Sequence, residues 1–158
     1  MAPSPYFTAR PYASGDRAEW LRMRLALWPQ MDAAAQLVDM DWWLAQRDTT
    51  VLVVPRAGHG AHTAGMALAG FAEVGTRSVA ESCETSPVAY LEGWYVDADM
   101  RRKGVGAALV RAAEDWARAK GFREFASDTE IANLTSQRAH AALGFTETER
   151  LVLYRKVL

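Results

Sequence analysis

The sequence predicts an α/β protein built on a mixed sheet with helices on both faces, and three observations lead to that prediction. Segments of β type alternate with segments of helical period along the 158 residues. The run from Val88 to Ser127 reads strand, helix, strand, which is the order of a right-handed parallel crossover. Three consecutive β-type segments precede that helix, an order that favours antiparallel pairing. No repeat or linker divides the chain, so we expect one domain over residues 1–158.

The first part of the chain predicts one strand and two helices. Residues 6–12 alternate like a strand and lead into a turn. Asp16 and Glu19 have the spacing of a capping box, which predicts a helix from there to Trp28, just before a proline. A second helix is expected over residues 33–46. Its apolar face consists of Leu37, Met40, Trp43 and Leu44.

The middle of the chain predicts three strands. Residues 50–54 are short and β-branched, as a buried strand is. The glycines of residues 58–60 indicate a turn, and residues 63–74 then return as a longer strand. Residues 75–87 are polar and without period, which indicates a loop, and residues 88–96 give the strongest strand pattern in the chain.

The last third predicts two helices and further strands. Residues 104–121 carry one apolar stripe of helical period and end on a glycine. Residues 122–127 favour a strand. Asn133 is placed to cap a helix that ends before Gly144. Residues 145–157 suggest two final strands or one bent hairpin.

Composition excludes several classes of protein. Half of the residues are apolar and 23% are charged, as in a globular chain rather than a disordered one. A net charge of −1 gives no general attraction to nucleic acid or anionic lipid. With Cys83 as its one cysteine the chain forms no internal disulfide, which suits a reducing compartment, and we expect this thiol to be inert. No signal peptide and no membrane-spanning apolar run are evident, so we expect a cytoplasmic protein.

The most informative segment joins the strand of residues 88–96 to the helix that follows. Amide groups at a helix N-terminus are unpaired, and the helix dipole favours an anion there. Gly104 and Gly106 permit close approach of a ligand to the backbone, and a basic run precedes them: Arg101, Arg102 and Lys103. Neither a Walker loop nor a dinucleotide fingerprint matches. The loop alone favours phosphate binding, and a solvated basic run with turn glycines is the alternative.

This loop resembles the pyrophosphate-binding loop of the GNAT N-acetyltransferases, in the pattern Arg101-x-x-Gly104-x-Gly106. Within that superfamily, three segments are similar to the aminoglycoside 6′-N-acetyltransferases: residues 91–96, 125–129 and 143–150. Leu27-Trp28-Pro29 resembles the same group. The likeness covers most of the chain and implies a mostly antiparallel sheet with a central, splayed pair of parallel strands. It also implies acetyl-coenzyme A as co-substrate, with no metal.

The resemblance assigns the cofactor to backbone groups. A bulge near Gly93 would free the amides of Trp94, Tyr95 and Val96 for the pantetheine arm and the thioester carbonyl. For the side chains of Trp94 and Tyr95, ordinary strand packing is the better interpretation. The remaining residues expected to contact the cofactor are Arg101, Arg102, Lys103, Gly104, Val105, Gly106, Ala107 and Asn133.

Two carboxylates are candidates for the acceptor side. Glu92 interrupts an apolar strand, where an unpaired charge is costly, so we expect it to meet a cation. That cation is either a substrate amine or an arginine from another strand. Asp128 follows a strand at its C-terminal end, where ligands gather in open sheets, although a turn-capping role fits it as well. We expect both to bind substrate first. Base catalysis by either, through a water, is the weaker hypothesis.

The resemblance adds Glu149 and Trp28 as acceptor contacts. Relatives often place an aromatic residue in the loop before the bulged strand, where this chain offers Val79. His140 occupies a position at which many members have a tyrosine that protonates the departing thiolate, so it is a candidate acid, with packing as the alternative. His59-x-x-His62 lacks a third ligand nearby and indicates a turn, not a metal site.

Three functions remain open from the sequence. The first is acetyl transfer to the 6′-amino group of aminoglycoside antibiotics, which confers resistance. The second keeps the chemistry and takes another polyamine or a peptide amine as acceptor. The third is a non-catalytic acyl-coenzyme A-binding module, which would not need an acidic pocket. The resemblance also implies a homodimer, which the apolar end at residues 151–154 permits.

Overall fold

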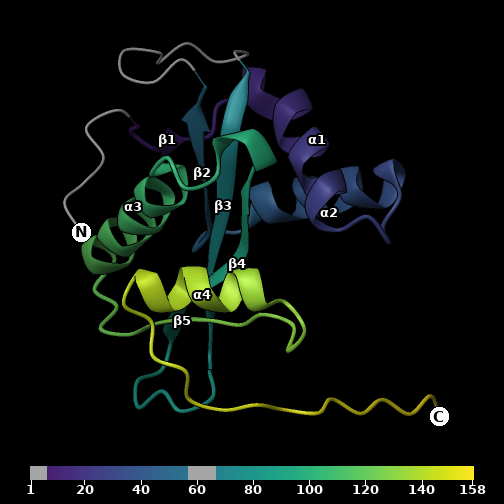
Figure 1. Ribbon diagram of the computed structural model, residues 1–158. Helices are drawn as coiled ribbons and strands as arrows, with labels where there is room; N and C mark the ends of the chain where they lie inside the picture. Colours follow the sequence, from purple (N-terminus) through teal and green to yellow (C-terminus); the bar gives the residue numbers. More distant parts are fainter. Residues whose placement is uncertain (1–6, 57–66) are drawn as a thin grey trace.

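The computed structural model describes residues 7–56 and 67–158, which form one five-stranded sheet covered by helices on both faces (Figure 1). The strands are β1 (Arg10–Pro11), β2 (Thr50–Pro55), β3 (Leu68–Arg77), β4 (Val88–Val96) and β5 (Phe125–Ser127). The helices are α1 (Arg17–Leu27), α2 (Ala33–Ala45), α3 (Val105–Ala119) and α4 (Leu134–Ala142). Among the described residues, no helix is long and apolar enough to cross a membrane.

The sheet has the strand order β1-β2-β3-β4-β5. The first four strands pair antiparallel, whereas β4 and β5 pair parallel, as the strand–helix–strand run predicted. This confirms the mixed, mostly antiparallel sheet. The parallel pair lies at the edge of the described sheet, not at its centre, because no strand follows β5 within the described residues.

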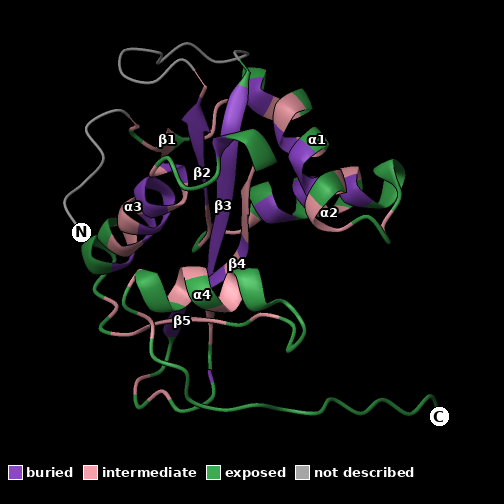
Figure 2. Cartoon of the chain, viewed as in Figure 1, coloured by how far each residue is buried: buried purple, intermediate pink, exposed green. Residues whose placement is uncertain are grey.

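Alternating side chains of the sheet bury the two larger hydrophobic cores. Leu52 and Val54 of β2 face α3, while Val51 and Val53 face α1 and α2. The two helical layers therefore lie on opposite faces of the sheet, with the purple, buried stripe of α3 turned toward the strands (Figure 2). Burial of one large apolar side chain such as Phe71 contributes about 1.5–3 kcal/mol to folding. These cores place β4 between the two helical layers.

A β-bulge interrupts β4 near the predicted place. Glu73 of β3 pairs with Gly93, but the next residue, Val74, pairs with Leu91, so Glu92 is the extra residue. On its other side β4 pairs with β5 only over Ala89–Leu91. Beyond Leu91, that side of β4 has no strand partner among the described residues, and the two parallel strands separate.

The N-terminal predictions require two corrections. The first strand is shorter than expected, covering Arg10–Pro11, and residues 1–6 lie outside the described part, as do the predicted turn at 58–60 and His59-x-x-His62. The capping box is wrong: the Asp16 carboxylate pairs with Arg10 instead of capping α1. Glu19 is engaged by Arg22 and by the backbone N–H of Leu68. Two ion pairs within this segment, and one hydrogen bond from β3, have replaced the predicted cap.

The C-terminal prediction is wrong in a larger way. Residues 145–157 form neither two strands nor a hairpin, and the chain from 146 onward runs exposed and without secondary structure. A strand needs a neighbouring strand to pair its backbone groups. Figure 1 shows the C-terminal segment running away from the sheet, and none of the described strands pairs with it. It leaves apolar side chains in solvent: Leu151, Val152, Leu153, Tyr154, Val157 and Leu158.

The helix ends beside the sheet follow the sequence signals. Gly121 and Gly144 both adopt positive φ, +87° and +90°, as expected of glycines that terminate helices. The Asn133 side chain accepts a hydrogen bond from the Ser136 amide at 3.0 Å and caps α4. Phe145 then turns back, and its ring lies 5.1 Å from that of His140. The cap and turn fix α4 beside the separating strands.

Candidate active site

The loop between β4 and α3 forms an open, positively charged helix N-terminus. Gly104 is the N-cap in the left-handed region at φ +95° and supplies no side-chain cap, so the first-turn amides of α3 lack that partner. Arg101, Arg102 and Lys103 are exposed immediately before it. Helix dipole, amides and charges therefore favour an anion at this point.

Gly106 lets the β4 side chains approach this helix end. A Cβ at Gly106 would lie 2.9 Å from Cζ2 of Trp94, closer than packed carbon atoms tolerate. The indole Nε1 of Trp94 is buried and has no hydrogen-bond partner within the described part of the chain. A buried donor without a partner is costly unless a ligand supplies the acceptor. The N-terminus of α3, together with the Trp94 indole, therefore fits a bound group that carries phosphate and amide oxygens.

Ser127 and His140 lie where β4 and β5 separate. Ser127 is the last residue of β5 paired with β4, and its Oγ is 2.9 Å from Nε2 of His140. The Nδ1 atom of His140 lies 2.8 Å from the carbonyl oxygen of Ser136, which can only accept, so Nδ1 carries the proton in the neutral ring. Nε2 then accepts from the Ser127 hydroxyl. His140 is thus oriented by its own helix, and Trp94 meets its ring edge-on at 5.3 Å.

A cavity of about 360 Å³ opens on the α1–α2 side of the bulge, and both Trp28 and Glu92 line it. Its lining residues are Arg24, Trp28, Gln30, Met31, Asp39, Trp42, Trp43, Glu73 and Glu92. Three carboxylates against one guanidinium make it acidic, and three indoles provide flat apolar walls. This is the composition expected of a site for a cationic, ring-shaped ligand.

Trp28 is held in this cavity by a buried arginine and by the bulge. The Arg24 guanidinium lies 4.7 Å from the Trp28 ring centroid and is itself fixed by Glu73 at 2.6 Å, by Gln36 and by Asp39. On the other side, a Cβ at Gly93 would lie 2.7 Å from Cη2 of Trp28. The missing side chain of the bulge glycine therefore makes the seat for the indole.

Glu73 is a site residue that sequence reasoning missed. Its Oε1 accepts from Trp20 Nε1 at 2.7 Å and from Arg24, while its carboxylate faces the cavity floor beside Gly93. Burial raises the pKa of Glu73 to about 7, and the neighbouring Arg24 opposes that rise. The signal was present: Glu73 interrupts an apolar strand just as Glu92 does.

The structure supplies the arginine that was the alternative partner for Glu92. Arg77 of β3 forms a bidentate ion pair with it, Nε–Oε1 2.8 Å and Nη2–Oε2 2.6 Å. Asp128 accepts from the Tyr90 hydroxyl at 2.7 Å, and its side chain remains 72% exposed. Of the two predicted carboxylates, Asp128 is therefore the one open to solvent.

The remaining predicted site residues lie outside the Trp28 cavity. Glu149 accepts a hydrogen bond from Ser82 Oγ at 2.6 Å, on the loop that also carries the exposed Val79. The Asn133 side chain is committed to its helix cap. Burial raises the pKa of the Cys83 thiol, which keeps it protonated and supports its predicted inertness. The described residues contain no cluster of three or more potential metal ligands.

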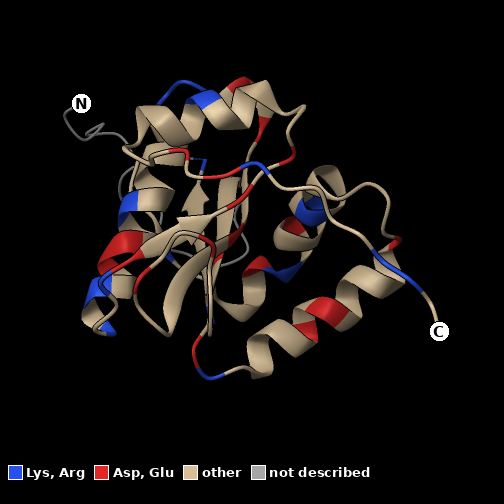
Figure 3. Cartoon of the chain, turned by 90° about the horizontal axis from the view of Figure 1, so that it is seen from below, with Lys and Arg blue, Asp and Glu red and all other residues tan. Residues whose placement is uncertain are grey.

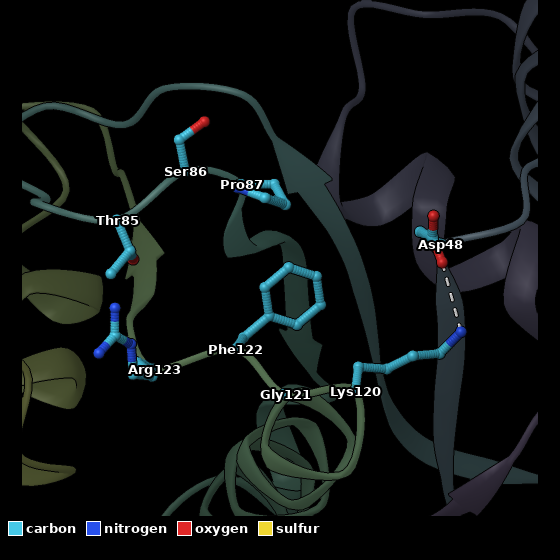
Figure 4. Close-up of a pocket in the computed structure, with 8 residues that line it drawn as sticks. All are labelled: Asp48, Thr85, Ser86, Pro87, Lys120, Gly121, Phe122 and Arg123. Atoms are coloured by element: carbon cyan, nitrogen blue, oxygen red, sulfur yellow. Dashed lines mark hydrogen bonds and ion pairs between the residues drawn. The ribbon is translucent and has the colours of Figure 1, made fainter.

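Another cavity, of about 400 Å³, lies at the far end of α3 (Figure 4). Phe122 forms its centre, and Lys120 at its rim already pairs with Asp48 at 3.3 Å. It is at the C-terminal end of the helix whose N-terminus makes the anion site. Acidic and basic side chains are interspersed over the whole molecule (Figure 3), so charge alone does not single out this cavity.

The chain belongs to the GNAT acetyltransferase family, whose sequence profile matches residues 17–145. It is 43% identical over 152 residues to the aminoglycoside N(6′)-acetyltransferase type 1 of Klebsiella aerogenes, covering 94% of this chain and 95% of that one. The enzyme of the same name from Serratia marcescens is 46% identical over 140 residues, 88% and 91% of the two chains. The structure also matches AAC(6′)-Iy in complex with the bisubstrate analogue CoA-S-monomethyl-acetylneamine, with a TM-score of 0.85, 34% identity and 97% and 99% coverage.

Proposed function

We propose that this protein transfers the acetyl group of acetyl-coenzyme A to the 6′-amino group of aminoglycoside antibiotics and so confers resistance to them. One observation carries the proposal. The chain matches, over nearly its full length, a relative solved with a bisubstrate analogue that joins coenzyme A to an acetylated aminoglycoside. In this chain the open N-terminus of α3 lies against Trp94 of β4, and an acidic, indole-walled cavity borders the bulge at Glu92 in the same strand.

The residues of the β4–α3 loop fit coenzyme A. We infer that the amides of Gly104, Val105, Gly106 and Ala107 hold its diphosphate, with Arg101, Arg102 and Lys103 as counter-charges and Asn133 at the neighbouring helix start. The backbone of Trp94, Tyr95 and Val96 faces the side of β4 that β5 leaves unpaired. When bound, the cofactor supplies the activated acetyl group, and these amides orient it.

The acceptor side binds a polycation. Trp28 offers its face to a sugar ring, and Glu73 and Glu92 supply negative charge in the same cavity. Asp128 and Glu149 supply further negative charge outside it. An alkyl ammonium of pKa near 10.4 needs roughly 4.6 kcal/mol to lose its proton at pH 7. That cost is small beside typical enzymatic barrier reductions, so a carboxylate acting through water suffices. Of the predicted pair, exposed Asp128 is better placed for this role than Glu92, which Arg77 engages.

His140 and Ser127 can supply the proton that the departing thiolate of coenzyme A takes up. Ser127 Oγ lies at the fork of β4 and β5, and His140 Nε2 stands behind it at 2.9 Å. The hydroxyl can give its proton to the departing thiolate and take one from Nε2 when both nitrogens of the His140 ring carry a proton. The acid role that the family resemblance suggests for His140 would then act at the fork through Ser127.

A thiol-release assay with kanamycin or tobramycin tests the function. We expect release of coenzyme A that depends on the aminoglycoside. Release only with other polyamines or peptide amines would replace the acceptor, and binding of acetyl-coenzyme A without any release would make the protein a sensor module. The acidic cavity around Trp28 favours the first outcome, because a module that reads only the cofactor has no use for it.

We further propose one catalytic domain that acts in the cytoplasm as a homodimer. The exposed apolar residues at 151–154 and 157–158 need a cover, and a second copy supplies one. Light scattering at micromolar concentration should give twice the chain mass. Leu153→Asp should shift the protein toward the monomer, with Arg155→Gln on the same segment as a control that makes the same change in net charge. An unchanged monomer in the wild type would refute the dimer.

A further inference from the structure

Arg77 stands at the centre of a small charged cluster beside the acceptor cavity. Its guanidinium pairs with both oxygens of Glu92 and lies 3.4 Å from the ring centroid of Tyr90. Its Nη2 is 3.9 Å from Oδ1 of Asp128, which the Tyr90 hydroxyl also contacts. The charged or titratable groups that face Arg77 are Glu92 and Tyr90 from β4 and Asp128 from the segment after β5.

The cluster poses an electrostatic problem for the proposed reaction. Two carboxylates attract an ammonium group, yet they also hold its proton and so oppose its use as a nucleophile. A guanidinium between them offsets one negative charge and leaves the group of three side chains at −1. The offset is permanent, because an arginine does not lose its proton in this pH range.

We propose that Arg77 is a positioning and specificity-determining residue: it holds Glu92, leaves Asp128 to receive the acceptor ammonium, and makes the bound amine easier to deprotonate. This inference rests on the proposed acetyl transfer to a polycationic amine and adds a residue to it. It also accounts for a bidentate ion pair at the rim of a cavity whose other charges are mostly negative.

Four variants separate this role from simple structural support. Relative to the wild-type cluster charge of −1, Arg77→Gln gives −2, Glu92→Gln gives 0 and the double variant returns to −1. Arg77→Lys keeps the charge and loses the bidentate fork. The measurement is kcat as a function of pH with kanamycin as acceptor and saturating acetyl-coenzyme A, because this profile reports groups in the loaded complex. Thermal unfolding checks that each variant is folded.

The acid limb is the part of the profile in which kcat falls as the pH is lowered. The readout is the pH at which this limb lies, not the maximum value of kcat. Arg77→Gln should move the limb up by about one pH unit, which is a tenfold lower kcat below the limb, and should lower KM for kanamycin. Glu92→Gln should move it down. The double variant and Arg77→Lys should lie near the wild type. If Arg77 had only a structural role, its substitution would change the maximum kcat and leave the pH of the acid limb unchanged.

Two results would overturn the inference. One is an acid limb that coincides in all variants, and the other is a double variant that stays with Arg77→Gln. If Arg77→Gln does not fold, Glu92→Gln and the double variant still differ by one unit of charge and must differ in their limbs. A wild type that binds acetyl-coenzyme A and releases no thiol with kanamycin would instead refute the proposed function itself.

Discussion

Two glycines help to position the two halves of the site, because the absence of a side chain leaves room for a neighbouring indole ring. Gly93 seats the Trp28 indole on the bulge, and Gly106 seats Trp94 at the start of α3. Neither glycine is needed for a positive φ; both are needed for close approach. Each therefore controls one substrate separately, because one contact faces the acceptor cavity and the other the cofactor loop.

Gly93→Ala should displace Trp28 from its seat. Because the added Cβ would come 2.7 Å from Cη2, the Trp28 ring must move. Its movement would disturb the packing of the Arg24 guanidinium on the ring. We expect KM for kanamycin to rise by about tenfold, while KM for acetyl-coenzyme A changes little. Steady-state kinetics with each substrate varied in turn measures this. An equal rise in both KM values would contradict the separation.

Gly106→Ala should do the reverse. Its Cβ would press on the Trp94 ring at 2.9 Å, so we expect weaker binding of coenzyme A by calorimetry and a nearly unchanged KM for kanamycin. Gly121→Ala is a matched control at the other end of α3. It sits at φ +87°, so it should cost about 1 kcal/mol of stability and leave binding intact. An unaltered affinity of Gly106→Ala for coenzyme A would contradict a role of the Gly106–Trp94 contact in binding it.

At the scale of elements, α1 is tied to the sheet by ion pairs instead of a helix cap. Arg22 joins Glu19 to Asp97, and Arg56 contacts the same aspartate. The Arg22 guanidinium, with the Leu68 amide, holds the pKa of Glu19 below its ordinary value. Because Asp97 opens the turn that leads to α3, this network connects the acceptor-side helix to the cofactor loop.

The sign of the pH dependence follows from that lowered pKa. A carboxylate with a depressed folded-state pKa stabilises the fold above its unfolded pKa and loses the effect as pH falls through the folded value. Glu19→Gln should therefore lower the free energy of unfolding by about 0.5 kcal/mol at pH 7, as a partly exposed pair would. The difference should shrink as the pH is lowered from 7 to 3 and Glu19 takes up its proton in the folded state. Urea titrations at both pH values measure it; a difference that does not shrink at low pH would contradict the ion-pair explanation.

At the scale of the whole molecule, the sequence predicted what local chemistry determines. The periodicity of α3 and the glycine ends of α3 and α4 depend on neighbouring residues, whereas the bulge near Gly93 was expected from the family resemblance. What it missed depends on distant partners. Arg77 and Glu92 are 15 residues apart, and Glu73 meets Arg24 across 49 residues, so no spacing rule could pair them. The predicted C-terminal strands also needed a distant partner, and none of the described strands pairs with residues 145–157.

The most direct measurement is the identity of the product. Kanamycin incubated with the protein and acetyl-coenzyme A, then examined by NMR, should carry one new acetyl group on the 6′-nitrogen. Unmodified kanamycin, with calorimetry showing that acetyl-coenzyme A binds, would contradict the proposed acceptor. An acetyl group on a different nitrogen would contradict the placement of the acceptor between Trp28 and Asp128.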